Sequence, residues 1–175
     1  DDATFGNFLP GDNAALVAKL RAQLDDHGEA FIYLWGAPGS GRSHLLQAAC
    51  HEASDRDKRA LYLPLNDLGH FPPHMLEDVE RLDLVVIDDI DQVIGRKRWE
   101  EALFHGFNRL RDAGKRLVIA APAAPRQLRV TLPDLASRLP PPRHHGLRGR
   151  APRFTALAAC LALVVAGILF WRIGG

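Results

Sequence analysis

Apolar residues in this chain form two alternating patterns, which are short continuous runs and longer stripes with helical spacing. Four runs have the length and composition of buried strands, at residues 31–35, 60–65, 82–89 and 117–121. Stripes with helical spacing predict helices at residues 12–24, 44–54 and from 99 to a stop at Gly114, and we expect a short helix at 74–81. Since strands alternate with helices, we predict an α/β fold with a parallel sheet and helices on both faces.

The turn between the first predicted strand and the helix after it is rich in glycine. Glycines in such a turn let successive backbone N–H groups converge on an anion, and the helix N-terminus adds a partial positive charge. A basic residue followed by Ser completes the pattern of a phosphate-binding loop. We therefore expect this turn to bind a nucleotide phosphate. The candidate residues are Gly36, Pro38, Gly39, Ser40, Gly41, Arg42, Ser43 and His44.

Arginine stands at position 42, where this type of loop usually has lysine. A guanidinium keeps the positive charge, but it is larger and planar and holds its donors in a fixed fork. We therefore expect nucleotide binding to survive better than hydrolysis. The hydroxyl of Ser43 is predicted to bind a Mg²⁺ ion that bridges the phosphates.

Two adjacent carboxylates, Asp88 and Asp89, end the third predicted strand. Together with the upstream loop they indicate a nucleotide site, in which Asp88 holds Mg²⁺ directly or through water. Asp89 is then placed to orient an attacking water as a base. An isolated pair of this kind would fit a turn or a helix cap better.

Charge and cysteine content narrow the function further. Residues 141–175 hold five of the 22 Lys and Arg and none of the 21 Asp and Glu, so the larger part of the chain is acidic. Because that part has no basic stripe, we expect no direct sequence-specific contact with DNA. Cys50 and Cys160 are too few and too far apart for a metal site or a disulfide framework, which favours a reducing, cytoplasmic location.

Several motifs, in the same order along residues 2–139, resemble the AAA+ domain of the bacterial DnaA family. They lie at residues 4–13, 33–36, 39–46, 86–90 and 132–139. Arg42 and the Leu34-Trp35 pair before the loop resemble in particular the shorter, Hda-like regulators of DnaA. The resemblance implies a P-loop NTPase domain over residues 1–139, with ADP or ATP and Mg²⁺ as ligands.

The resemblance also implies a regulator of replication initiation that contacts the DnaA initiator together with the sliding clamp and promotes hydrolysis of DnaA-bound ATP. Arg138 matches the arginine finger of the family, which acts across a subunit interface on the partner's ATP. Without the flanking motif, Arg138 would be interpreted as a surface arginine in a helix. The segment that wraps the adenine is matched by Phe8, Leu9, Gly11 and Asn13. We expect weak ATPase activity at most, and self-association stays open.

The chain departs from the family pattern in three places. The clamp-binding peptide that precedes the domain in Hda-like proteins is not found at its start, which puts clamp binding in doubt. A polar sensor residue is expected after the fourth strand, where this chain has Ala120-Ala121-Pro122. After Leu139, a Pro- and Arg-rich segment at 140–153 reads as a linker in place of a fifth strand and a helical lid. Without that strand, residues 31–35 would form an unpaired apolar edge.

Residues 154–171 are uncharged and almost wholly apolar, just long enough for a membrane-spanning helix, and we extend the predicted helix to residue 173. Arginines before the segment would keep the nucleotide domain in the cytoplasm. The segment fits an inner-membrane tail anchor or, as we favour, an out-of-frame or chimeric end. Besides the Hda-like regulator, a membrane-tethered nucleotide-binding protein without a replication role and a non-functional frameshifted fragment therefore stay open.

Overall fold

The computed structural model describes residues 3–25, 27–66, 72–139 and 144–147. Their strands form one sheet with the order β2-β3-β4-β1-β5, in which every neighbouring pair is parallel. The strands are β1 (Phe31–Trp35), β2 (Ala60–Pro64), β3 (Leu84–Asp88), β4 (Arg116–Ala121) and β5 (His144–Gly146). The predicted parallel α/β fold is confirmed.

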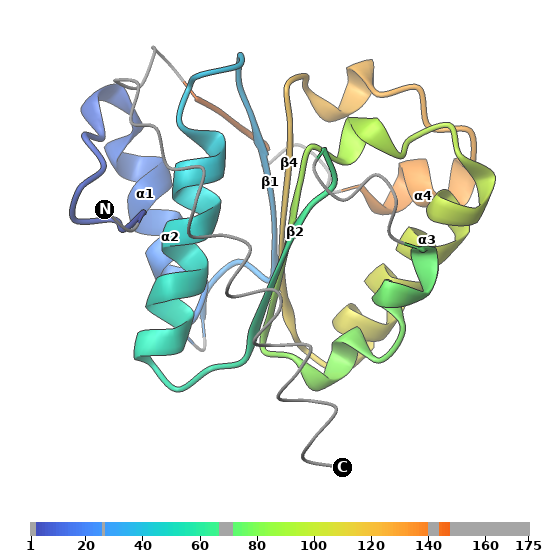
Figure 1. The fold of residues 1–175 in the computed structure, drawn as a ribbon, viewed down its shortest axis with the longest axis horizontal. Coiled ribbons are helices and arrows are strands. Elements are labelled where there is room, and N and C mark those ends of the chain that lie inside the picture. Colours follow the sequence, from blue (N-terminus) through green and yellow to red (C-terminus); the bar gives the residue numbers. More distant parts are fainter. Residues whose placement is uncertain (1–2, 26, 67–71, 140–143, 148–175) are drawn as a thin grey trace.

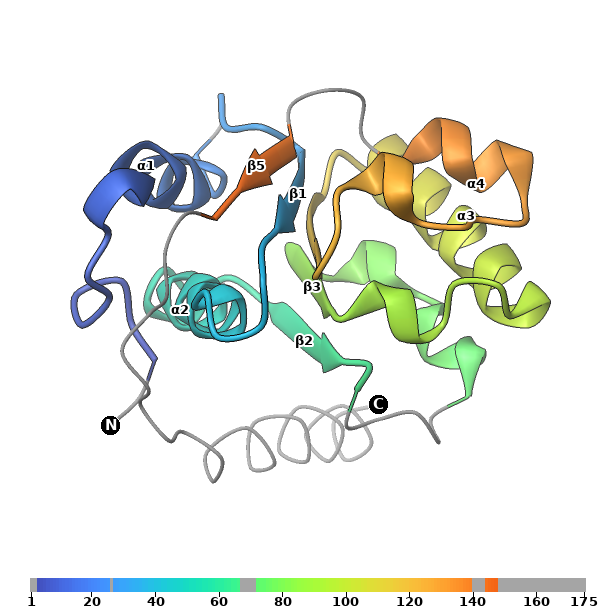
Figure 2. The same cartoon turned by 90° about the horizontal axis from the view of Figure 1, so that it is seen from above.

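Helices cover both faces of the sheet, with α1 and α2 on one face and α3 and α4 on the other (Figures 1 and 2). The helices are α1 (Ala14–Ala22), α2 (Arg42–Asp55), α3 (Lys97–Asp112) and α4 (Pro133–Arg138). Short 3₁₀ turns occur at Gly11–Asn13, Pro73–Leu76, Val79–Arg81, Ile90–Gln92 and Pro125–Gln127. No helix within the described ranges is long and apolar enough to cross a membrane. The apolar segment 154–171 and the lid position lie outside those ranges.

The helix predicted over residues 74–81 is instead two separate 3₁₀ turns. Glu77 between them has extended backbone angles, and Asp78 has a φ of 58°. Both conformations interrupt helical hydrogen bonding. Leu76 and Val79 of these two turns are nevertheless buried in the core.

Alternation along β1 divides the core into two layers. Ile32 and Leu34 lie in the apolar cluster beneath α1 and α2, together with Leu45 of α2. Tyr33 lies in the cluster beneath α3, which includes Leu103 and Phe107. Since both faces of β1 are covered, the strand is held firmly in register, and the loop that follows Trp35 starts from a fixed point.

The prediction that the sheet lacks a fifth strand is wrong. β5 pairs with β1 from Tyr33 to Trp35, so the expected unpaired apolar edge is covered there. The segment 140–153 is therefore not wholly a linker, because Leu147 after β5 is buried in the core. His144, His145 and Gly146 carry no apolar signal, but an edge strand needs only backbone pairing. A Cβ at Gly146 would lie 2.8 Å from the Trp35 ring, so this close approach requires glycine.

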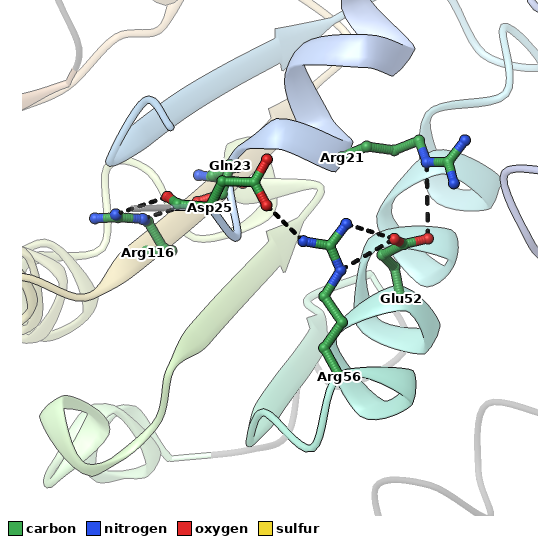
Figure 3. Close-up of polar contacts among 6 residues, drawn as sticks. All are labelled: Arg21, Gln23, Asp25, Glu52, Arg56 and Arg116. Carbon is green, nitrogen blue, oxygen red and sulfur yellow. Dashed lines mark hydrogen bonds and ion pairs between the residues drawn. The ribbon is translucent and has the colours of Figure 1, made fainter. Parts of the chain in front are cut away.

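A polar network joins the elements at the edge where the strands begin (Figure 3). Arg56 at the end of α2 pairs with Glu52 at 2.6 Å and with Asp25 after α1 at 2.7 Å. Arg116 at the start of β4 donates to the carbonyl oxygens of Gln23 at 2.8 Å and Asp25 at 3.2 Å. The network lies at the end of α2 opposite to the glycine-rich loop.

Candidate functional site

The loop between β1 and α2 adopts the shape that its glycines allow. Gly39 and Gly41 have φ angles of 76° and 91°, a region that other residues enter at a cost. Ser40 N donates to Ala37 O at 3.1 Å and closes the turn. A Cβ at Gly36 would lie 2.8 Å from Ser40 Oγ, so the loop folds back tightly on the end of β1.

This loop delivers the chain directly to the N-terminus of α2, which begins at Arg42. Gly41 is the N-cap residue, and as a glycine it has no side chain that could cap the helix start. The first backbone N–H groups of a helix have no partner within the helix and carry part of its positive dipole. Loop and helix start together therefore form a site that attracts an anion such as phosphate.

Two serines of the loop differ sharply in environment. Ser43 is exposed at the helix start, where its hydroxyl is open to a ligand. Ser40 is only 3% exposed, and its Oγ has no hydrogen-bond partner among the described residues. Buried hydroxyls are nearly always hydrogen-bonded, so an orphan in this loop indicates a group that a ligand can engage. Pro38 and Gly39 are exposed on the rim of the loop.

The structure brings Arg42 to the end of β3, since its Nη2 lies 3.1 Å from Asp89 Oδ1. Arg42 is 9% exposed, and its Nη1 is buried without a hydrogen-bond partner in the described part of the chain. Asp89 has a φ of 52° and ψ of 49°, a left-handed conformation that is uncommon outside glycine. The loop and the two carboxylates predicted from sequence are thus joined at the edge where the strands end.

Asp88 ends β3 and is 2% exposed. Its Oδ2 accepts a hydrogen bond from the Tyr62 hydroxyl of β2 at 3.1 Å, and its Oδ1 accepts one from Asp89 N at 3.0 Å. Both oxygens are therefore oriented by donors and keep a second lone pair for a further donor. Tyr62 could not be predicted from sequence, because a tyrosine in a strand has no signal beyond its place in the apolar run.

Ser43 and Asp88 suit Mg²⁺, because both offer oxygen ligands and this ion keeps several of its waters. Since both oxygens of Asp88 already accept hydrogen bonds, contact through a bound water fits this carboxylate better than direct coordination. No group of three or more His, Cys, Asp or Glu gathers into a metal site in the described ranges. The oxygen ligands here would therefore be completed by water and phosphate.

The N-terminal segment lies against the start of α2. The Phe8 ring is 5.5 Å from the ring of His44, and His44 Nε2 lies 3.0 Å from Thr4 O. Phe8 is buried, as is Asn13, whereas Leu9 is 80% exposed. Gly11 has a φ of 47° at the turn before α1. The structure thus places the segment predicted to wrap a base beside the helix that starts at the phosphate loop.

Arg138 ends the short helix α4 and is exposed. Its side chain makes no hydrogen bond or ion pair within the described residues. Its position depends on Glu100 of α3, whose carboxylate accepts from the backbone N–H of Gly95 at 2.8 Å, Thr131 at 2.9 Å and Leu132 at 2.7 Å. These bonds tie the residues before α4 to α3.

Glu100 is 1% exposed. Burial acts to raise the pKa of its carboxyl, but the backbone N–H groups of Thr131, Gly95 and Leu132 outweigh it and hold the pKa below its ordinary value. This role could not be predicted from sequence, because Glu100 is followed by the exposed Glu101 and no pattern distinguishes these two glutamates of the same helix.

Solved structures of replication initiators share this fold. A DNA replication initiation factor matches with a TM-score of 0.75 at 26% identity, over 83% of this chain and 49% of that chain. AMPPCP-bound DnaA from Aquifex aeolicus matches with a TM-score of 0.73 at 25% identity, over 83% and 50%. Domain III of DnaA from Thermotoga maritima matches with 0.68 at 27% identity, over 99% and 75%.

The chain spans about half the length of the first two of these proteins. The family model of the bacterial DnaA ATPase domain matches residues 1–142, which is most of the chain. The protein therefore belongs to the family of bacterial DnaA ATPase domains, within the AAA+ proteins.

Proposed function

We propose that this chain binds an adenine nucleotide, ADP or ATP, at the loop of residues 36–44. The observation that carries the proposal is the uncapped start of α2 behind two glycines with positive φ. Backbone N–H groups of this kind bind phosphate with the help of the helix dipole. Solved DnaA with 25% identity to this chain carries AMPPCP, an ATP analogue, which supports the same class of ligand.

The N-terminal segment is the proposed contact for the base. Phe8 packs against His44, which keeps the segment close to the phosphate loop. The exposed Leu9 side chain offers apolar surface to an adenine ring. Gly11 and Asn13 continue the segment toward α1. Ser43 and, through water, Asp88 would hold Mg²⁺, which neutralises phosphate charge when bound.

Calorimetric titration with ADP and Mg²⁺ tests this site. Ser43→Ala removes the proposed metal ligand, and we expect affinity to fall about tenfold. Ser54→Ala is the matched control, because Ser54 is an exposed serine at the far end of the same helix. Equal affinity of both variants and the wild type would overturn the assignment of the loop.

We further propose that the protein regulates replication initiation by promoting hydrolysis of ATP bound to the DnaA initiator, with the sliding clamp as the family's further partner. Arg138 is the proposed trans-acting residue, since its guanidinium is exposed and unpaired within the described residues. A guanidinium that reaches the partner's phosphates stabilises the charge that develops during phosphoryl transfer. Arg42, in contrast, is buried in the chain's own site.

Mixing the protein with ATP-loaded DnaA and a DNA-loaded clamp tests this role. Arg138→Ala should lower the stimulated hydrolysis on the order of a thousandfold while ADP binding by the variant stays unchanged. Arg126→Ala is the control, because Arg126 is exposed in the turn after β4 and precedes α4. Full stimulation by Arg138→Ala would rule out the arginine finger.

A further inference from the structure

The two terminal nitrogens of the Arg42 guanidinium have different surroundings. Nη2 pairs with Asp89 at 3.1 Å, whereas Nη1 is buried and has no hydrogen-bond partner among the described residues. The two side chains are 9% and 22% exposed, so solvent screens this pair less than it screens a surface ion pair. A lysine could not present two such ends, because its ammonium is a single point charge.

Position 42 is the place from which a loop of this type offers its cation to nucleotide phosphate. Carboxylate and phosphate oxygens bind a guanidinium with similar forked geometry, so they are alternative partners for the same group. We propose that Asp89 competes with the nucleotide phosphates for Arg42, and that this Arg42–Asp89 latch lowers nucleotide affinity. The latch rests on the proposed function, since it regulates the same phosphate site.

The backbone around Asp89 fixes the position from which its carboxylate competes with phosphate. Its left-handed conformation is strained, and such residues persist only where their surroundings fix them. Its N–H donates to Asp88 Oδ1 at 3.0 Å, and its carbonyl accepts from Gln92 N at 3.0 Å. The carboxylate is therefore offered from a fixed position, and phosphate can bind both ends of the Arg42 guanidinium only by displacing it.

The decisive variant is Asp89→Asn, which removes the charge and keeps the shape. Asparagine tolerates a positive φ better than most residues, so the turn should survive. We expect ADP with Mg²⁺ to bind about threefold to tenfold more tightly by calorimetric titration. Asp89→Gly also suits the positive φ and repeats the test if Asp89→Asn does not fold. An unchanged or weaker affinity, with the wild type binding ADP normally, would overturn the latch alone.

Two controls separate the latch from a general effect of charge. Asp91→Asn removes the same charge two residues later, where the carboxylate accepts from Gln92 Nε2 at 2.9 Å, and should change affinity about twofold or less. In an Arg42→Ala background, Asp89→Asn should bring no gain. A gain that persists there would overturn the latch. If neither the wild type nor these variants bind ADP, the nucleotide site itself fails, and the latch fails with it.

Discussion

At the edge where the strands begin, Arg116 donates to three carbonyl oxygens, whereas at the opposite edge Ser40 Oγ and Arg42 Nη1 are buried without partners in the described residues. At the edge where the strands begin, Arg56 also pairs with two carboxylates, those of Asp25 and Glu52 (Figure 3). A saturated network adds stability, while an unmet buried group costs it. The difference indicates that the first edge holds the fold together and that the loop keeps hydrogen-bonding capacity for a ligand.

The largest expected effect tests how much an unmet buried group costs at a place away from the loop. Glu100→Ala leaves the backbone N–H groups of Gly95, Thr131 and Leu132 without their buried acceptor, so we expect a loss of about 3 kcal/mol in the free energy of unfolding. Urea denaturation measures the change. Glu101→Ala, which removes only an exposed ion pair at 3.9 Å to Lys97, should cost about 0.5 kcal/mol or less. Similar losses in both variants would contradict this role.

Arg116→Met tests the saturated edge directly. The thioether keeps much of the apolar stem but cannot donate to the carbonyls of Gln23 and Asp25, so we expect the protein to lose about 2 kcal/mol. Nucleotide affinity should stay unchanged, since the site lies at the other edge. Arg111→Met is the control, because Arg111 is exposed and, among the described residues, pairs only with its neighbour Asp112. A loss of ADP binding in Arg116→Met would show that the edges are coupled.

A smaller effect concerns how stability falls at low pH, through Asp83 at the edge where the strands begin. Burial acts to raise the pKa of Asp83, but the Arg59 N–H and the Lys115 ammonium outweigh it and lower the pKa below 3.8. A lowered carboxyl pKa gives stability that is present above the unfolded value and is lost as pH falls through the folded value. Between about pH 6 and pH 3, the wild type should therefore lose about 1 kcal/mol more than Asp83→Asn does. Parallel pH profiles would contradict the expectation.

The loop and the strands around it could be predicted because their signals are local. The glycines of residues 36–41 and the apolar run of β1 each determine a conformation within a few residues. Even the placement of Asp88 and Asp89 at the same edge follows from the parallel sheet, since all parallel strands end on one side.

What could not be predicted depends on contacts between distant segments. β5 has no apolar pattern, and its place against β1 depends on the fit of Gly146 to the Trp35 ring. The pairing of Arg42 with Asp89 needs both the loop and the strand end in position, and neither motif contains it. The loop motif alone predicts that Arg42 contacts phosphate, and it contains no sign of the contact with Asp89.

The smallest expected effect concerns the buried hydroxyl of Ser40. Ser40→Ala removes a buried polar atom that lacks a partner, so the free energy of unfolding should stay unchanged or rise by about 1 kcal/mol at most. Ser137→Ala is the matched control, since Ser137 Oγ donates to Asp134 O at 2.7 Å and its loss should cost about 0.5 kcal/mol. If Ser40 serves a ligand, ADP affinity should fall a few-fold in Ser40→Ala and not in Ser137→Ala. A clear destabilisation of Ser40→Ala with normal ADP binding would place this hydroxyl with the groups that hold the fold, and the contrast between the two edges would then rest on Arg42 alone.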